Sequence, residues 1–244
     1  MKRYLITFAY DGSNYNGYQR QPKLKTIQGE IEKALTKING GKKVEIHASG
    51  RTDAKVHALN QKAHFDLKMQ ISCLKLKRAL NSNVSSDIYI KEVKETNSDF
   101  HARYYVKAKE YIYIINTGEY NPIERNAIYQ YNKKLNSKHI KKALKLLKGE
   151  HDFSAFASQE ELKEDCVRKI YKAKLMIKGS NIILVFLANG FLKYQVRNMV
   201  GTLIEIGEEK RRSQDITNIL ISKDRKKAGK KAKPEGLYLS KVIY

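Results

Sequence analysis

Hydrophobic residues change their spacing several times along the first part of this chain. Stretches that alternate with a period of two, typical of strands, are followed by stretches with a spacing of three to four, typical of amphipathic helices. The expected elements are a strand over 4–10, a helix over 27–38 after Thr26 as N-cap, strands over 43–48 and up to Leu67, a helix over 72–80 and a strand over 88–93. This β-α-β-β-α-β order is typical of a split βαβ sandwich, an antiparallel sheet with helices on one face.

The rest of the chain carries similar patterns without repeating the sequence. The expected elements are a strand over 104–115, a helix on the stripe from Ile140 to Leu147, a hairpin of 170–177 with 182–188, and a very apolar helix over 191–206. Because no linker rich in Pro, Gly or Ser interrupts the chain, we expect two packed domains that meet near residue 105, an N-terminal α/β domain (1–105) and a C-terminal α/β domain (106–244). The predicted fold class is α/β, more narrowly α+β, in which two similar halves form an extended mixed sheet with a central basic cleft.

The charge of the chain predicts a polyanionic partner. The chain has 48 Lys and Arg residues against 25 Asp and Glu, a formal net charge of +23. Because so many like charges repel one another in the folded protein, a polyanion is expected to offset them, and nucleic acid is the leading candidate. The 16 Tyr residues offer faces on which exposed bases can stack, which favours RNA loops over duplex DNA. Near the end, residues 223–233 read as a mobile basic loop that follows phosphates, with Lys226, Lys227, Lys230 and Lys231 as candidate contacts.

Other functional classes have little support. With 244 residues and 41% hydrophobic side chains the chain can build a real core, and no stretch approaches the roughly 20 apolar residues of a membrane helix. The N-terminal residues run directly into strand-like alternation without a signal-peptide core, and Cys73 and Cys166 stand far apart. We therefore expect a soluble cytoplasmic protein without a disulfide framework or a cysteine zinc site.

A polar loop over 49–60 holds the residues with the most chemistry. It combines Arg51, Asp53, Lys55 and His57 between two expected strands, where loops place functional groups. The structural alternative is that Thr52 and Asp53 only cap a turn while Arg51 pairs with Asp53 at the surface. His57, like His101, lacks a metal-ligand spacing and is expected to be structural, so no metal site is predicted.

The apolar helix over 191–206 is interrupted by Arg197. Desolvating a cation without a partner costs several kcal/mol, so Arg197 needs a carboxylate, and Asp53 is a candidate.

Five ordered motifs together are similar to the tRNA pseudouridine synthase A family. The stretch Gly50-Arg51-Thr52-Asp53-Ala54 with Val56-His57-Ala58 resembles the family's central signature. The others are Tyr10-Asp11-Gly12-Ser13 with Gly17-Tyr18-Gln19-Arg20-Gln21, Asp99-Phe100-His101-Ala102-Arg103, Phe191-Leu192 through Val196-Arg197-Asn198-Met199-Val200-Gly201, and Glu235-Gly236-Leu237-Tyr238-Leu239. The resemblance covers nearly the whole chain.

The resemblance implies an isomerase that converts uridine to pseudouridine in the anticodon stem-loop of tRNA, at conventional positions 38 to 40, as a homodimer and without a cofactor. Asp53 matches the family's essential aspartate, Tyr111 its active-site tyrosine, and Arg197 the arginine that holds the aspartate. Gln19 and Arg20 would lie beside a flipped base or bind phosphate.

The residue types suit such a reaction on chemical grounds. Breaking the bond to C1′ builds positive charge on the ribose, which a carboxylate can stabilise or attack, and an arginine can hold that carboxylate bidentately. Whether Asp53 adds to C1′ or removes the 2′ proton to give a glycal is left open by the residues. Either route needs one carboxylate under the ribose.

Three positions depart from the family pattern. Lys55 replaces a Gly, which would cost about a kilocalorie per mole or more if the backbone there has positive φ. Either the loop is adjusted at this position or Lys55 reaches toward phosphate. Glu110 stands where a basic residue is common, and Tyr18 replaces a Trp. Lys55 and Glu110 keep open a paralogue that acts on ribosomal RNA. A separate alternative is a catalytically inactive protein that binds RNA or associates with the ribosome.

Overall fold

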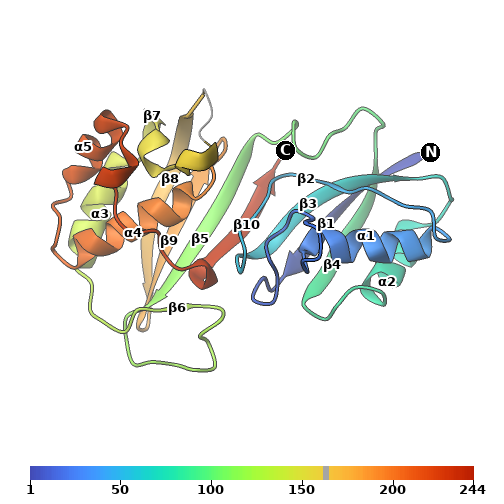
Figure 1. The fold of residues 1–244 in the computed structure, drawn as a ribbon, viewed down its shortest axis with the longest axis horizontal. Coiled ribbons are helices and arrows are strands. Elements are labelled where there is room, and N and C mark those ends of the chain that lie inside the picture. The colour runs from blue at the N-terminus through green and yellow to red at the C-terminus, as the bar shows by residue number, and fades with distance from the viewer. Residues whose placement is uncertain (162–164) are drawn as a thin grey trace. The chain divides into compact units, whose positions relative to one another are not determined.

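The computed structural model describes residues 1–161 and 165–244 (Figure 1). The chain divides into two compact units, Met1–Lys107 together with Tyr238–Tyr244, and Ala108–Leu237. The division after Lys107 lies close to the expected boundary near residue 105, but the last residues belong to the first unit instead of the C-terminal half. The reason is strand pairing, since β10 (Leu237–Ile243) runs parallel to β3 (His57–Leu67), with Tyr238 opposite His57.

The first unit has the expected β-α-β-β-α-β order. Its elements are β1 (Lys2–Tyr10), α1 (Ile27–Ile38), β2 (His47–Ala48), β3, α2 (Cys73–Asn81) and β4 (Ile88–Thr96). In the sheet the order is β4-β1-β3-β10, where β1 is antiparallel to both β3 and β4. The alternation in β1 buries Tyr4, Ile6, Phe8 and Tyr10 in the core, as the period of two predicts.

Side-chain caps start both helices of this unit where the sequence indicates. The Thr26 hydroxyl accepts a hydrogen bond from the Gly29 N–H, and the Ser72 hydroxyl accepts one from the Lys75 N–H. The expected strand over 43–48 is wrong in its extent, since only His47–Ala48 pair as β2. Ile46 directs its N–H to a carboxylate oxygen of the buried Glu32, 3.3 Å away, and so is satisfied without a neighbouring strand.

The second unit contains the strands β5 (Ala108–Asn116), β6 (Tyr129–Gln130), β7 (Gly149–Asp152), β8 (Val167–Lys178) and β9 (Asn181–Ala188). Its helices are α3 (Ser137–Leu146), α4 (Gln195–Gly207) and α5 (Asp215–Ser222), with the short 3-10 turns η1 (Ser154–Phe156), η2 (Gln159–Glu161), η3 (Arg225–Lys227) and η4 (Pro234–Gly236). The strand order is β5-β9-β8-β7. The expected hairpin is confirmed as β8 and β9, and together the two units confirm the α/β fold class.

Two expected elements begin later than their hydrophobic pattern suggests. The strand expected over 104–115 starts at Ala108, because a turn closed by the Tyr105 N–H and the His101 carbonyl at 3.1 Å occupies the residues before it. The helix expected over 191–206 starts at Gln195, whose side chain accepts a hydrogen bond from the Leu192 N–H at 2.8 Å. Once begun, α4 is buried along almost its whole length, as its composition predicts.

No helix within 1–161 and 165–244 combines the length and hydrophobicity that crossing a membrane requires.

Candidate active site

Asp53 lies on a loop between β2 and β3 that is held through its neighbour Thr52. The Thr52 carbonyl accepts a hydrogen bond from the Tyr18 N–H at 3.1 Å, and its hydroxyl lies 2.8 Å from the buried Tyr10 hydroxyl. The Val56 N–H donates to the Asp53 carbonyl at 3.2 Å and closes the turn. The half-buried Asp53 side chain therefore projects from a backbone with little freedom.

Two glycines let the preceding loop pack directly on the Asp53 loop. Gly17 has φ of +92°, and a Cβ on it would lie 3.0 Å from the Thr52 carbonyl oxygen. A Cβ on Gly12 would lie only 2.1 Å from the Val56 carbonyl oxygen. Both glycines belong to the motif before the first helix, so close backbone approach explains why that motif accompanies the loop.

Lys55 has φ of +64°, which confirms the strained conformation expected where a glycine is replaced. Its N–H donates to the Tyr15 carbonyl at 3.2 Å, and its side chain is exposed. The loop therefore keeps the left-handed backbone despite the lysine.

His57, at the start of β3, links the Asp53 loop to the loop that contains Gly12. Its Nδ1 accepts a hydrogen bond from the Gly12 N–H at 3.1 Å, and its ring stacks on Tyr238 with centroids 4.6 Å apart. With 3% of its surface exposed, the imidazole has the geometry of a structural residue.

In the second unit, Tyr111 lies on β5 opposite Phe186 of β9. Its ring meets the edge of Phe191 at 5.2 Å with an interplanar angle of 85°. Tyr111 keeps 8% of its surface exposed, whereas Tyr113, on the same face of the strand, is fully buried. Tyr111 therefore lies at the margin of the core.

Arg197, in the first turn of α4, is joined to the C-terminal segment by two hydrogen bonds. Its Nε donates to the Ala232 carbonyl at 2.9 Å, and the Ala232 N–H donates back to the Arg197 carbonyl at 3.0 Å. The guanidinium carbon also lies 5.7 Å from the centroid of the Tyr194 ring. These contacts hold the side chain of a largely buried cation in one direction.

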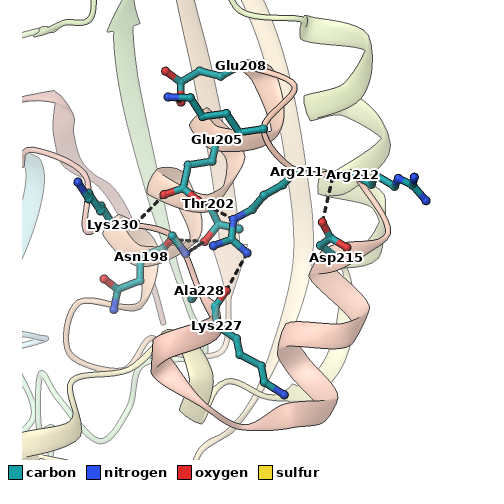
Figure 2. A network of polar contacts seen from close by, with 12 residues as sticks. Asn198, Thr202, Glu205, Glu208, Arg211, Arg212, Asp215, Lys227, Ala228 and Lys230 are labelled. Atoms are coloured by element: carbon teal, nitrogen blue, oxygen red, sulfur yellow. Dashed lines mark hydrogen bonds and ion pairs between the residues drawn. The ribbon is translucent and has the colours of Figure 1, made fainter.

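The basic segment 223–233 is anchored on α4, which corrects its interpretation as a mobile loop. Thr202 accepts a hydrogen bond from the Gly229 N–H at 2.8 Å, and Glu205 accepts one from the Lys230 N–H at 3.0 Å (Figure 2). The Asn198 side chain accepts a third from Arg225 at 2.9 Å. The anchoring uses the backbone N–H groups of Gly229 and Lys230 and the Arg225 side chain. Four lysine side chains of the segment are exposed, namely those of Lys226, Lys227, Lys230 and Lys231.

The chain matches the family model described as tRNA pseudouridine synthase over residues 6–105 and 143–244. It belongs to the tRNA pseudouridine synthase family. The expectations of family membership and of an enzyme of this isomerase family are thereby confirmed.

Curated relatives agree with this pseudouridine synthase assignment over the full length of the chain. Proteins named tRNA pseudouridine synthase A from Geobacillus sp. (strain WCH70) and from Exiguobacterium sp. (strain ATCC BAA-1283 / AT1b) are 43% and 44% identical, each over 100% of this chain and 98% of the relative. The protein of that name from Streptococcus mutans is 42% identical over 100% of this chain and 99% of its own.

Among solved structures, the crystal structure of a Cbf5-Nop10-Gar1 complex is 12% identical and covers 82% of this chain and 54% of its own, with a TM-score of 0.34. That similarity is too low to carry an argument.

The remaining expected RNA contacts of this pseudouridine synthase lie at the surface of the first unit. Gln19, Arg20 and Arg51 are exposed, and the Arg20 guanidinium lies 3.1 Å from the buried Glu32 carboxylate. Arg20 is thus positioned by an acid that the sequence patterns did not single out.

Glu110, which stands where the family commonly has a basic residue, has a partner within the second unit. Its carboxylate lies 3.7 Å from Lys172 Nζ.

Asp53 belongs to the first unit, while Tyr111 and Arg197 belong to the second, and their meeting in one active site stays a prediction. Sequence reasoning missed Tyr194, which has φ of +65° just before α4 and carries Lys231 Nζ 3.6 Å from its ring centroid. No pattern of residue types signals that conformation. Among the described residues no cluster of His, Cys, Asp or Glu could hold a metal ion.

Proposed function

We propose that this protein isomerises uridine to pseudouridine in the anticodon stem-loop of tRNA, at positions 38 to 40. The observation that carries the proposal is the Asp53 loop, with Gly17 packed against the Thr52 carbonyl in a chain of this family. The curated relatives named tRNA pseudouridine synthase A and the net charge of +23 support tRNA as the substrate.

In the proposed reaction the Asp53 carboxylate acts below the ribose of a uridine that has left its stack. The bond between N1 and C1′ breaks with its electron pair on the uracil, and the uracil turns while it is held. C5 then bonds to C1′, any bond between Asp53 and C1′ breaks to return the carboxylate, the proton on C5 leaves, and N1 takes up a proton. Asp53 either bonds to C1′ or removes the 2′ proton, and in both routes it offsets the positive charge that builds on the ribose. Atoms balance without a cofactor because the product is an isomer of the substrate.

Tyr111 and Arg197 take supporting roles in this proposal. Tyr111, at the margin of the core, offers a ring on which the extruded uracil stacks, and its hydroxyl is a candidate acceptor for the C5 proton. The Nε atom of Arg197 donates to the Ala232 carbonyl. In the proposed site its Nη atoms hold the Asp53 carboxylate. A lysine could not provide this two-point contact.

Exposed basic side chains of both units would bind the RNA backbone. The anchored lysines of segment 223–233 would contact phosphates, as would Arg20, Arg51 and Lys55, with Gln19 beside the extruded base. We also propose a cytoplasmic homodimer in which one tRNA lies across both protomers.

Tritium release from C5-labelled uridine in a tRNA transcript tests the proposal. The wild type should release tritium, and Asp53→Asn should lose release while it binds the transcript with unchanged affinity. Ribosomal RNA transcripts serve as the second substrate. Release from ribosomal RNA alone would overturn the tRNA assignment, and no release from either RNA would favour an inactive RNA-binding protein.

A further inference from the structure

Four aromatic side chains of the first unit form a group that the proposed reaction does not use. They are His47, His64, His101 and Tyr104, which we call the histidine–tyrosine stack. The rings of His64 and His101 meet in an edge arrangement, with centroids 4.6 Å apart and an interplanar angle of 66°. Those of His101 and Tyr104 are stacked, with centroids 4.3 Å apart and an interplanar angle of 30°. His47 stacks on His64 at 5.0 Å. The group thus runs from the sheet, where His64 lies on β3, to the turn before β5.

The inner end of the stack is fixed. His64 is 2% exposed, and its Nδ1 accepts a hydrogen bond from the Ala102 N–H at 3.1 Å. Burial and the neighbouring imidazoles of His101 and His47 lower the pKa of His64 to about 4, so its ring is neutral near pH 7. The Arg103 N–H donates to His101 Nδ1 at 3.1 Å and sets the direction of the second ring.

The outer end of the stack is open. Tyr104 is 76% exposed, although its ring already lies nearly parallel to that of His101. A tyrosine that is oriented in advance loses little conformational entropy when another flat ring stacks on it. Base stacking on such a ring is tolerant of sequence, because every base has a π-face.

The charge around the stack suits a ligand that carries phosphate. Arg103 precedes Tyr104 in the chain and is exposed. Arg3 is committed elsewhere, since its guanidinium pairs with Asp66 at 2.8 Å. The other nearby acid, Asp99, accepts a hydrogen bond from the Tyr105 hydroxyl at 3.4 Å. An exposed aromatic ring preceded in the chain by an exposed arginine suits a nucleotide, which offers a base to stack and a phosphate to pair.

We propose that Tyr104, supported by His101, is a stacking platform for an unpaired RNA base, and that Arg103 contacts the phosphate of that nucleotide. This nucleotide is distinct from the uridine on which Asp53 would act. The inference deepens the proposed function and rests on it for the choice of RNA as ligand.

The test measures dissociation constants for a single-stranded ten-nucleotide oligouridylate, a blunt RNA duplex and a tRNA transcript. Tyr104→Ala should weaken binding of the oligouridylate about tenfold, while binding of the duplex stays unchanged. Tyr104→Phe should bind all three RNAs like the wild type. Tyr89→Ala is the matched control, because Tyr89 is a 55% exposed tyrosine of the same unit. Thermal melting checks that each variant is folded.

Several results would overturn the platform. Wild-type affinity of Tyr104→Ala for the oligouridylate would do so, as would an equal loss on the duplex or an equal loss in Tyr89→Ala. A changed oligomeric state of Tyr104→Ala with unchanged RNA affinity would assign this face to a protein partner instead. Tritium release by the wild type is scored separately. If the wild type releases tritium and Tyr104→Ala binds RNA normally, the platform alone fails; if the wild type is inactive and the Tyr104 effect persists, the proposed reaction alone fails.

Discussion

The carbonyl oxygen of Lys230 lies 1.6 Å from the position that a Cβ on Gly201 would occupy. Segment 223–233 therefore rests directly on the backbone of α4, and only a glycine at position 201 allows it. The neighbouring hydrogen bonds from Gly229 to Thr202 and from Lys230 to Glu205 depend on this close approach.

Gly201→Ala should push segment 223–233 off the helix. Since the clash is with backbone, we expect a loss of about 1–3 kcal/mol in the free energy of unfolding, together with weaker tRNA binding. Urea unfolding and a filter-binding assay measure the two effects. Ile221→Ala, at a 74% exposed position of α5, is the control and should change stability by less than about 0.5 kcal/mol. A Gly201→Ala protein as stable as the wild type would contradict the contact.

Gly17→Ala should disturb the Asp53 loop. A Cβ at position 17 meets the Thr52 carbonyl at 3.0 Å, so the loop must shift, and a displacement of an ångström can cost about 100-fold in kcat. Single-turnover tritium release measures the rate. Gly41→Ala is the matched control, because Gly41 also has positive φ, +82°, but nothing lies within 4 Å of its Cβ position. Equal rates in the two variants would show that backbone strain alone, and not contact with the loop, matters.

Stability of the first unit should fall in acid through His64. Its pKa is lowered by burial from 6.5 to about 4, so the unfolded chain binds more protons between these values and stability rises with pH across that interval. Acidification from pH 7 to 4 should therefore remove about 3 kcal/mol through this group. Denaturant titrations at several pH values measure the change. His64→Gln should flatten the dependence and His139→Gln, a more exposed control, should keep it; identical profiles in both variants would exclude His64 as the origin.

Neutralising Lys226, Lys227, Lys230 and Lys231 together should weaken tRNA binding and reduce its salt dependence. Each lost phosphate contact lowers the slope of log K against log salt by about 0.7 to 0.9. Binding measured between low and moderate salt gives the slope. Two lysines of α2, the exposed Lys75 and the half-buried Lys77, provide a comparison of equal charge per residue. A slope that stays at the wild-type value would rule out phosphate contacts by the segment.

Local sequence patterns determined the order of the secondary-structure elements in the first unit and where its helices begin. The order of strands and helices in the first unit and the caps at Thr26 and Ser72 follow from residues adjacent in the chain, because period and capping act over a few residues. The positive φ of Lys55 is indicated only by the family pattern, which has glycine at that position. The motifs around Asp53 likewise indicated the family that the comparisons then showed.

Tertiary structure decided what depends on distant partners. Ile46 leaves the strand pattern because the carboxylate of Glu32 satisfies its N–H, and segment 223–233 is anchored because α4 offers Thr202 and Glu205 at the right spacing. The pairing of β10 with β3 joins residues from opposite ends of the chain. Such contacts are selected by packing and hydrogen bonding in space, for which the spacing of hydrophobic residues along the chain carries no signal.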